Sequence, residues 1–312
     1  MTARQKPQKI LLPLDGSERS LGTVRYITKI KLFKQMQVVL MHVYAGAPES
    51  YYDLERDPRS TGTVVSVRAW EAQQKNNARD YMQKAKAILL DADFSEEAVS
   101  VKIQKRKQGF ARDIIKEARE GYAAVVARRR GVGAIRGLVV GSVANKLLQG
   151  LDFLPFILAG RAPVGNKILV AFDGSAGAMR AVDCVGTFLG ASDFNICLLH
   201  VIRGREAAAA EHQRLFSPQK YVDDAQIDIV ARFDEAKAML MHSGFKESQL
   251  STKLIIGVQS RAASIVDEAK KQNYGTIIMG RRGLSQVRAF FIGRVTNKVI
   301  HLGRDRTVWV VR

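Results

Sequence analysis

Cysteine, acidic residues and long apolar runs are all scarce in this chain of 312 residues. Its two cysteines, Cys184 and Cys197, both lie in apolar surroundings, which favours two core side chains over a disulfide or a metal site. No segment reaches the roughly 18 uninterrupted apolar residues that a membrane span needs. The first residues also lack the apolar core of a signal peptide. A cytoplasmic location is therefore expected.

The shortage of acids leaves the chain strongly basic. Its 49 lysines and arginines outnumber 30 aspartates and glutamates, for a net charge of +19. Such a charge favours anionic partners, yet no run of basic residues exceeds three and the aromatic residues do not interleave with them as in a nucleic-acid stacking platform. Binding of nucleic acid or of an anionic membrane is kept as an alternative hypothesis.

The chain repeats itself over the length of a domain. Residues 9–17 (KILLPLDGS) return at 167–175 (KILVAFDGS), an offset of 173 − 15 = 158 residues. Arg-Arg-Gly at 129–131 returns at 281–283, an offset of 281 − 129 = 152 residues. A period near 150 residues is far longer than that of solenoid repeats and matches a whole domain. We predict two domains, 1–160 and 167–312, joined by a linker around Gly160 to Asn166.

Within each copy, short apolar runs alternate with amphipathic helical patterns. The strands expected in the first copy are Ile10–Leu14, Val38–Val43, Val99–Gln104, Ala123–Ala127 and Leu154–Ala159. Those expected in the second are Ile168–Phe172, Ile196–Ile202, Lys253–Ile256, Thr276–Met279 and Thr307–Val311. Helices are expected after Ser17 and Ser175, near 64–90 and 222–243, over the patterns at Ile114 and Ile265, and from Ser142 and Arg294. The order predicts an α/β fold with a doubly wound parallel sheet in each copy.

Two loops in each copy should lie beyond the carboxyl ends of the strands, where ligands bind in open parallel sheets. One is the Asp-Gly-Ser turn after the first strand. The other follows the fourth strand and reads Gly280-x2-Gly283-x9-Gly293-Arg294 in the second copy. In the first copy the same loop reads Arg128-x2-Gly131-x9-Gly141-Ser142.

A glycine loop that opens a helix is suited to phosphate. Glycines let backbone N–H groups approach an anion closely, and the first amides and the dipole of the helix point at the same place. An aspartate at the end of the first strand is placed to accept a hydrogen bond from a ribose hydroxyl or a base. The spacing is not that of a Walker A loop.

These motifs resemble the universal stress proteins, and the resemblance covers nearly the entire chain as two tandem copies. It implies a five-stranded sheet of order 3-2-1-4-5 in each copy, of the adenine-nucleotide alpha hydrolase-like type. It also implies a site for ATP or another adenine nucleotide in one or both copies. In the second copy the matching residues are Asp173, Gly174, Cys197 with its strand neighbours, Met279, Gly280, Gly283, Gly293 and Arg294. In the first copy they are Asp15, Gly16, Leu40 with its strand neighbours, Arg128, Gly131, Gly141 and Ser142.

Each copy departs once from the family pattern. Arg128 replaces the first glycine, where its side chain would either crowd the phosphate approach or pair with phosphate oxygens. Arg294 replaces a Ser or Thr and brings positive charge to a helix start, which opposes the dipole unless an anion is present. That conflict is the sequence feature that favours a phosphate in the second site.

The resemblance implies a stress or signalling protein without a dedicated reaction. A slow ATP hydrolase or phosphotransferase is the alternative, for which Asp15 or Asp173 would hold Mg²⁺ through the nucleotide. The resemblance also implies that the final strands, Leu154–Ala159 and Thr307–Val311, pair antiparallel inside one chain as a pseudo-dimer, with Pro155 at an end or an unpaired position. A homodimer would be a further step of assembly.

Other polar residues near these loops have plainer interpretations. Arg129, Arg130, Arg281 and Arg282 are either phosphate neighbours or solvated surface residues, and the same holds for Arg136 and Arg288. His42 and His200 occupy the same place in the two copies. Since no carboxylate or second histidine lies at ligand spacing, they are expected to be core histidines rather than catalytic ones.

Overall fold

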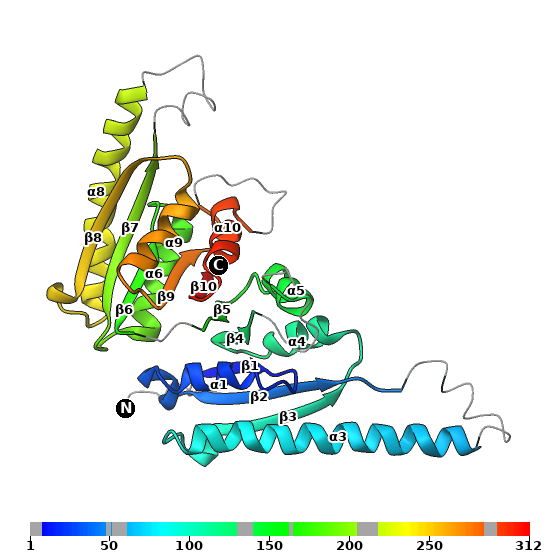
Figure 1. Cartoon of the computed structure of the whole chain (residues 1–312). Coiled ribbons are helices and arrows are strands. Elements are labelled where there is room, and N and C mark those ends of the chain that lie inside the picture. Colours follow the sequence, from blue (N-terminus) through cyan, green and yellow to red (C-terminus); the bar gives the residue numbers. More distant parts are fainter. Residues whose placement is uncertain are drawn as a thin grey trace. The chain divides into compact units, whose positions relative to one another are not determined.

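The computed structural model describes residues 8–47, 51, 61–129, 140–161, 165–204, 218–283 and 292–312, the side chains of 218–226 excepted. The chain divides into two compact units, Met1–Leu151 and Asp152–Arg312. Figure 1 labels the elements of both. The expected domains, 1–160 and 167–312, remain a prediction.

The first unit alternates strands and helices as the sequence pattern predicts. Its elements are β1 (Lys9–Pro13), α1 (Leu21–Ile27), η1 (Lys31–Gln35), β2 (Gln37–Tyr44), α3 (Thr61–Leu90), η3 (Glu96–Ala98), β3 (Val99–Lys105), α4 (Phe110–Ala118), β4 (Ala124–Arg128) and α5 (Ser142–Gly150). The strands are parallel neighbours in the order β3-β2-β1-β4. Between β1 and β4 the chain order reverses, which is where such sheets bind ligands.

The second unit repeats this arrangement. Its elements are β5 (Phe156–Ala159), β6 (Lys167–Ala171), α6 (Ala176–Leu189), β7 (Asn195–Arg203), α8 (Pro218–His242), η4 (Glu247–Gln249), β8 (Leu250–Val258), α9 (Arg261–Lys271), β9 (Thr276–Gly280), α10 (Arg294–Leu302) and β10 (Thr307–Val311). The five parallel strands follow the order β8-β7-β6-β9-β10, which is the expected 3-2-1-4-5.

Strand β5 pairs with β10 in the antiparallel direction, through Leu158 with Val308 and Phe156 with Val310. This confirms the antiparallel pairing of the two final strands. Pro155 stands one residue before β5, so its missing amide donor costs the ladder nothing. Every residue of β5 and β10 is buried, as expected for apolar strands covered on both faces.

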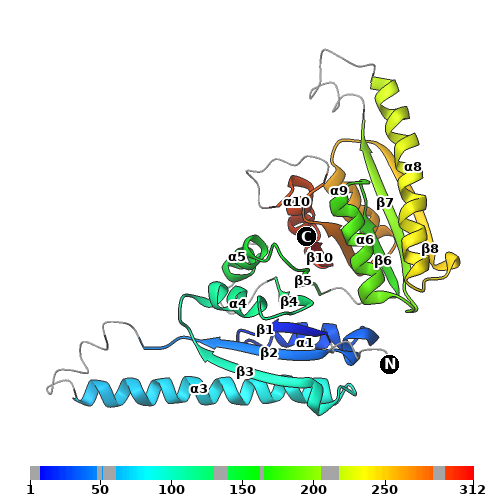
Figure 2. The ribbon, with the colours of Figure 1, turned by 180° about the vertical axis from the view of Figure 1, so that it is seen from behind.

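The core of the second unit forms around β10. Trp309 is fully buried, and Phe188 of α6 meets its ring edge-on with centroids 5.7 Å apart. On the sheet, α6 packs with α8, while α9 packs with α10, so two helix pairs cover the strands. Seen from behind, α8 runs along β7 (Figure 2).

Helix α3 is only partly packed. Its 30 residues bury Ala78, Tyr81, Met82, Ala85 and Leu89, all in its second half and all on one helical face. The helix contacts β2 and β3. Neither this helix nor any other in the described parts of the chain is long and apolar enough to cross a membrane.

Two of the differences between the structure and the sequence-based expectation are informative. Strand β8 extends over Leu250–Val258 rather than Lys253–Ile256, because this outermost strand leaves polar residues such as Ser251 exposed and so lacks a continuous apolar run. Helix α1 begins at Leu21, later than the turn at Ser17 suggested. Most of the long loops expected at 44–63 and 203–221 lies outside the described residues.

Candidate functional site

In the second unit, Asp173 lies at the carboxyl end of β6 in a tight turn. Gly174 has a φ of +71°, which glycine adopts without steric cost. The Asp173 carboxylate accepts a hydrogen bond from the amide of Ser175 at 3.1 Å, and the Ser175 hydroxyl accepts one from the amide of Ala178 at 3.1 Å. Ser175 therefore caps α6, as predicted, and the same turn fixes the orientation of Asp173.

The loop after β9 meets this turn directly. A Cβ placed on Gly283 would lie 2.2 Å from Oδ2 of Asp173, so the carboxylate rests against the glycine backbone. A Cβ on Gly280 would lie 2.7 Å from the backbone of Gly177 at the start of α6. Both glycines thus permit approaches that a side chain would prevent. The predicted residues Asp173, Gly174, Gly280 and Gly283 are brought together at one edge of the sheet.

Helix α10 begins beside the same loop. The amide of Gly293 donates to the carbonyl of Arg281 at 2.8 Å, and the hydroxyl of Thr296 donates to the carbonyl of Gly280 at 2.9 Å. The amide of Gly293 is thus occupied by the loop. The amides of the first helical turn, which begins at Arg294, are those that a phosphate could use. Met279 pairs with Ala171 in the adjacent strand and is buried.

The first unit places Asp15 and Gly16 in the corresponding turn, with Gly16 at a φ of +84°. Asp15 accepts hydrogen bonds from the amide of Ser17 at 3.1 Å and from its hydroxyl at 2.7 Å. The amide of Gly141 donates to the carbonyl of Arg129 at 2.7 Å, which mirrors Gly293 and Arg281. Helix α5 begins at Ser142. Gly131 lies outside the described residues.

Arg128 is the main difference between the two sites. Its guanidinium nitrogen Nη1 lies 3.0 Å from where a Cβ of Gly22 would stand, so the side chain is laid over helix α1. The glycine that occupies this strand position in the second copy, Gly280, instead lets the helix backbone itself approach. At this strand position the first site thus carries a side chain against the helix, where the second has a close backbone approach.

The register of the sheet shows that the second-strand residues expected at the site lie too deep. Cys197 pairs with Leu169, and Leu169 stands four residues before Asp173 in β6. Because a strand advances about 3.3 Å per residue, Cys197 lies well below the end of the sheet where Asp173 stands. Leu40 likewise pairs with Leu12 and is completely buried. Cys197 is buried as well.

Residues Val43 and Val201 are level with the two aspartates and were missed. The amides of Leu14 and Phe172 bond to the carbonyls of Met41 and Leu199, so one more step along each pair of strands reaches Asp15 beside Val43 and Asp173 beside Val201. The signal was available, because both valines follow the recurring histidine at the same offset. The base-contact expectation therefore passes to Val43 and Val201.

The two recurring histidines support the turns. Nδ1 of His42 lies 2.8 Å from the carbonyl oxygen of Leu14, and Nδ1 of His200 lies 2.8 Å from that of Phe172. Burial lowers the pKa of His200, so its ring is neutral at pH 7 and donates from Nδ1 to the carbonyl. Each histidine thus holds the residue that precedes the aspartate, which is a positioning role.

The loop arginines are not all solvated. Arg129 and Arg281 are 5% and 6% exposed, so the interpretation as surface residues is wrong for these two. Because a buried guanidinium needs compensating polar groups, such positions carry structural or binding roles. Arg130, Arg136 and Arg288 lie outside the described residues.

The described part of the chain holds no group of three or more metal-ligating side chains. Neither Asp15 nor Asp173 therefore belongs to a group of that size among these residues. A magnesium ion at either would need further oxygen ligands, such as nucleotide phosphates and water. Magnesium binding through the nucleotide remains a prediction.

Comparison with known proteins agrees with the architecture. "Universal stress protein YxiE" of Bacillus subtilis is 27% identical over 142 residues, which cover 44% of this chain and 93% of that protein. A universal stress protein of Mycolicibacterium smegmatis is 27% identical over 170 residues, or 53% of this chain and 54% of that one.

Solved structures share the fold over almost the full length. A universal stress protein from Archaeoglobus fulgidus matches with a TM-score of 0.59 at 18% identity, covering 97% of this chain and 96% of that one. A functionally unknown protein from Pseudomonas aeruginosa matches with a TM-score of 0.54 at 17% identity, covering 98% and 92%. The sequence profile of the universal stress protein family matches residues 6–153 and again 165–312. The chain therefore belongs to the universal stress protein family and carries two copies of its domain.

Proposed function

We propose that this protein is a stress or signalling module that binds an adenine nucleotide of the ATP class without a dedicated reaction. The site of the second unit is the primary one, and the site of the first is its altered copy. The observation that carries the proposal is the contact between the Asp173 carboxylate and the Gly283 backbone, at the edge where β6 and β9 end. An acid for the nucleoside and an amide loop for the phosphates are thereby adjacent.

The chemistry of each part suits the nucleotide. Asp173 would accept hydrogen bonds from ribose hydroxyls, and Val201 would supply an apolar edge for the base. Gly283 and the first turn of α10, which follows Gly293, would direct amides at phosphate oxygens. Arg294 at that helix start would pair with the phosphate. The bound anion would then offset the unfavourable position of this positive charge at the positive end of the helix dipole.

The first unit supports a weaker version of the same site. Asp15, Gly16, Gly141 and Ser142 retain its chemistry, and the hydroxyl of Ser142 could donate to a phosphate. Arg128, however, stands where the second copy has Gly280, and its guanidinium covers α1. We expect lower affinity here than in the second unit.

The deciding experiment is mass spectrometry of ligand released from protein purified without added nucleotide, joined to calorimetric titration with ATP in the presence and absence of Mg²⁺. Bound ATP at 100 times its Kd would add about 2.7 kcal/mol of stability, seen as a higher melting temperature. Absence of released nucleotide together with no ATP-dependent rise in melting temperature would contradict the proposal.

Two variants assign the site. Gly283→Gln forces a side chain into the space of the Asp173 carboxylate, so we expect ATP binding to fall at least tenfold. Gly62→Gln is the matched control, because a Cβ at Gly62 meets nothing within 4 Å. Equal affinity in Gly283→Gln and in the control would show that the nucleotide binds elsewhere. Hydrolysis of bound ATP in single-turnover conditions, abolished in Asp173→Ala, would instead promote the enzymatic alternative.

A further inference from the structure

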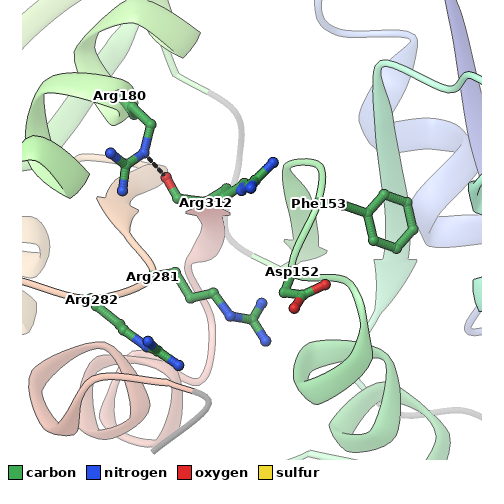
Figure 3. A pocket seen from close by; sticks show the side chains of 6 residues that line it. All are labelled: Asp152, Phe153, Arg180, Arg281, Arg282 and Arg312. Carbon is green, nitrogen blue, oxygen red and sulfur yellow. Dashed lines mark hydrogen bonds between the residues drawn. The ribbon is translucent and has the colours of Figure 1, made fainter. Parts of the chain in front are cut away.

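A pocket of about 310 Å³ opens within the second unit beyond the end of β10. Figure 3 shows the six side chains that line it. They are Asp152, Phe153, Arg180, Arg281, Arg282 and Arg312. Four of the six are arginines, which come from helix α6, from the loop after β9 and from the residue after β10.

This pocket is separate from the proposed nucleotide site. Strand β9 pairs with β6 on one side and with β10 on the other. Asp173 follows β6, whereas Arg312 follows β10, so the two lie on opposite sides of β9. The loop 280–283 is shared, with its glycines contacting the Asp173 turn and its arginines lining the pocket.

The pocket carries more positive charge than its own residues neutralise. Asp152 is the one acid among its lining residues, against four guanidinium groups. Arg281 is 6% exposed; burial lowers its pKa, and the charge of Asp152 acts in the opposite direction. Arginine nevertheless stays protonated in proteins. The side chains that line this small cavity therefore carry three more positive than negative charges.

The hydrogen bonds of Arg180 and Arg282 leave N–H donors at the pocket for a ligand. Arg180 donates from Nε to the backbone carbonyl of Arg312, which fixes one side chain at the pocket and engages one of its five N–H donors (Figure 3). Nε of Arg282 is buried and has no hydrogen-bond partner among the described residues. An unmet buried donor in a cationic cavity indicates an anionic acceptor.

We propose that this pocket binds a diphosphate or triphosphate group. Guanidinium forks match phosphate oxygens in bidentate geometry, and several of them are needed to neutralise a polyphosphate. The volume is at the lower end of the range for ligand pockets, which suits a compact anion. The group is either a free inorganic polyphosphate or the tail of a nucleotide that reaches across β9.

Calorimetric titration of the full chain with inorganic pyrophosphate tests the proposal. Arg180 and Arg312 are exposed, so Arg180→Gln and Arg312→Gln should fold, which melting curves will verify. Removing either should weaken pyrophosphate binding about ten- to hundredfold, as expected for a lost charged hydrogen bond. Arg304→Gln, an exposed arginine that does not line the pocket, is the control of equal charge change.

Three results would overturn it. They are the absence of measurable pyrophosphate binding, unchanged affinity in both pocket variants, and an equal loss in Arg304→Gln, which would reveal nonspecific attraction to a basic surface. The proposal does not depend on the nucleotide site, because pyrophosphate binding is measured without nucleotide. Asp173→Ala, which removes the acid of the nucleotide site and leaves the loop 280–283 unchanged, should therefore retain pyrophosphate binding even where it loses ATP.

The source of the phosphate group is decided by adding ATP. If the natural ligand is a free polyphosphate, pyrophosphate will bind to ATP-saturated protein with unchanged affinity. If the pocket receives a nucleotide tail, ATP will compete with pyrophosphate and Arg312→Gln will weaken ATP as well. Competition without any loss of ATP affinity in Arg312→Gln would contradict both sources.

Discussion

The two copies differ in which element carries an arginine where the fourth strand meets the first helix. In the first, Arg128 at the end of β4 covers Gly22 of α1. In the second, the strand position is Gly280 and the helix position is Arg180, at the same offsets of 280 − 128 = 152 and 180 − 22 = 158 that relate the motifs. The exchange lets the α6 backbone approach β9 at Gly280, and it places Arg180 among the residues that line the pocket. One pair of substitutions thus accounts for both special features of the second unit.

The helix that follows the aspartate turn also begins at different positions in the two copies. In the second unit the carbonyl of Ser175 accepts the amide of Met179 at 2.9 Å, a regular helical bond. In the first, the carbonyl of Ser17 accepts the hydroxyl of Tyr81 at 3.0 Å and the amide of Ser20 at 3.0 Å. A side chain from α3 thereby holds the turn open, and α1 begins only at Leu21.

Exchanging the arginine and glycine should have the largest effect. Gly280→Arg puts a Cβ 2.7 Å from the Gly177 backbone, which cannot swing away as a side chain would. We expect a loss of about 3 kcal/mol in the second unit. The reciprocal Arg128→Gly should cost the first unit only about 1 kcal/mol. Urea unfolding followed by Trp309 fluorescence in a Trp70→Phe background reports on the second unit, and Trp70 fluorescence in a Trp309→Phe background reports on the first.

An equal cost for the two substitutions would contradict the comparison. It would mean that the helix tolerates a side chain at 280 as well as it does at 128. Gly62→Arg is the control for adding a long side chain at an open glycine, and it should leave the Trp309 transition unchanged.

Tyr81→Phe should have the next largest effect, about 1–2 kcal/mol in the first unit, because the hydroxyl bonds to the carbonyl of Ser17 and lies 2.6 Å from the hydroxyl of Ser20. The second copy has Arg232 at the corresponding position, an offset of 232 − 81 = 151 residues, and its guanidinium donates to Glu235 at 2.9 Å instead of to the serine turn. A neutral Tyr81→Phe would show that the late helix start has another cause.

The same tyrosine predicts a dependence on pH. Burial raises the pKa of Tyr81 to about 12, from an ordinary value of 10. The folded state therefore binds this proton more tightly than the unfolded state, and the contribution is complete below pH 10 and lost as the pH rises toward 12. Between pH 9 and 12 the free energy of unfolding should fall less steeply in Tyr81→Phe than in the parent protein. Parallel curves for the two proteins would contradict the assignment.

The sequence predicted the fold closely because its strands carry their own signal. Runs such as Thr307–Val311 are apolar at nearly every position, and the structure finds β10 over the same residues. The recurring Asp-Gly-Ser turns and glycine loops likewise predicted which segments meet. Asp173 and Gly283 are separated by more than a hundred residues, yet the rule that parallel strands end at one edge brought them together.

What the sequence could not predict depends on contacts between distant segments. The late start of α1 is set by Tyr81, which is 64 residues from Ser17. The depth of Cys197 depends on its register with β6, which an apolar run does not reveal. A run of charged residues likewise does not reveal which of its side chains are buried. Arg281 is therefore expected on the surface or at a phosphate, although it lies buried within the fold.

Removing the two turn serines should have the smallest effect and tests the comparison most finely. Ser175→Ala takes away the cap of α6 and should cost about 1 kcal/mol. Ser17 also accepts an amide, that of Ser20 at 3.2 Å, but α1 has no side-chain cap at its start and the turn retains its bonds to Tyr81. Ser17→Ala should therefore cost less, as measured by urea unfolding of each unit. If both substitutions lower the free energy of unfolding by the same amount, Ser17 is a full helix cap. The two copies would then differ in where their helices begin but not in what stabilises the helix start.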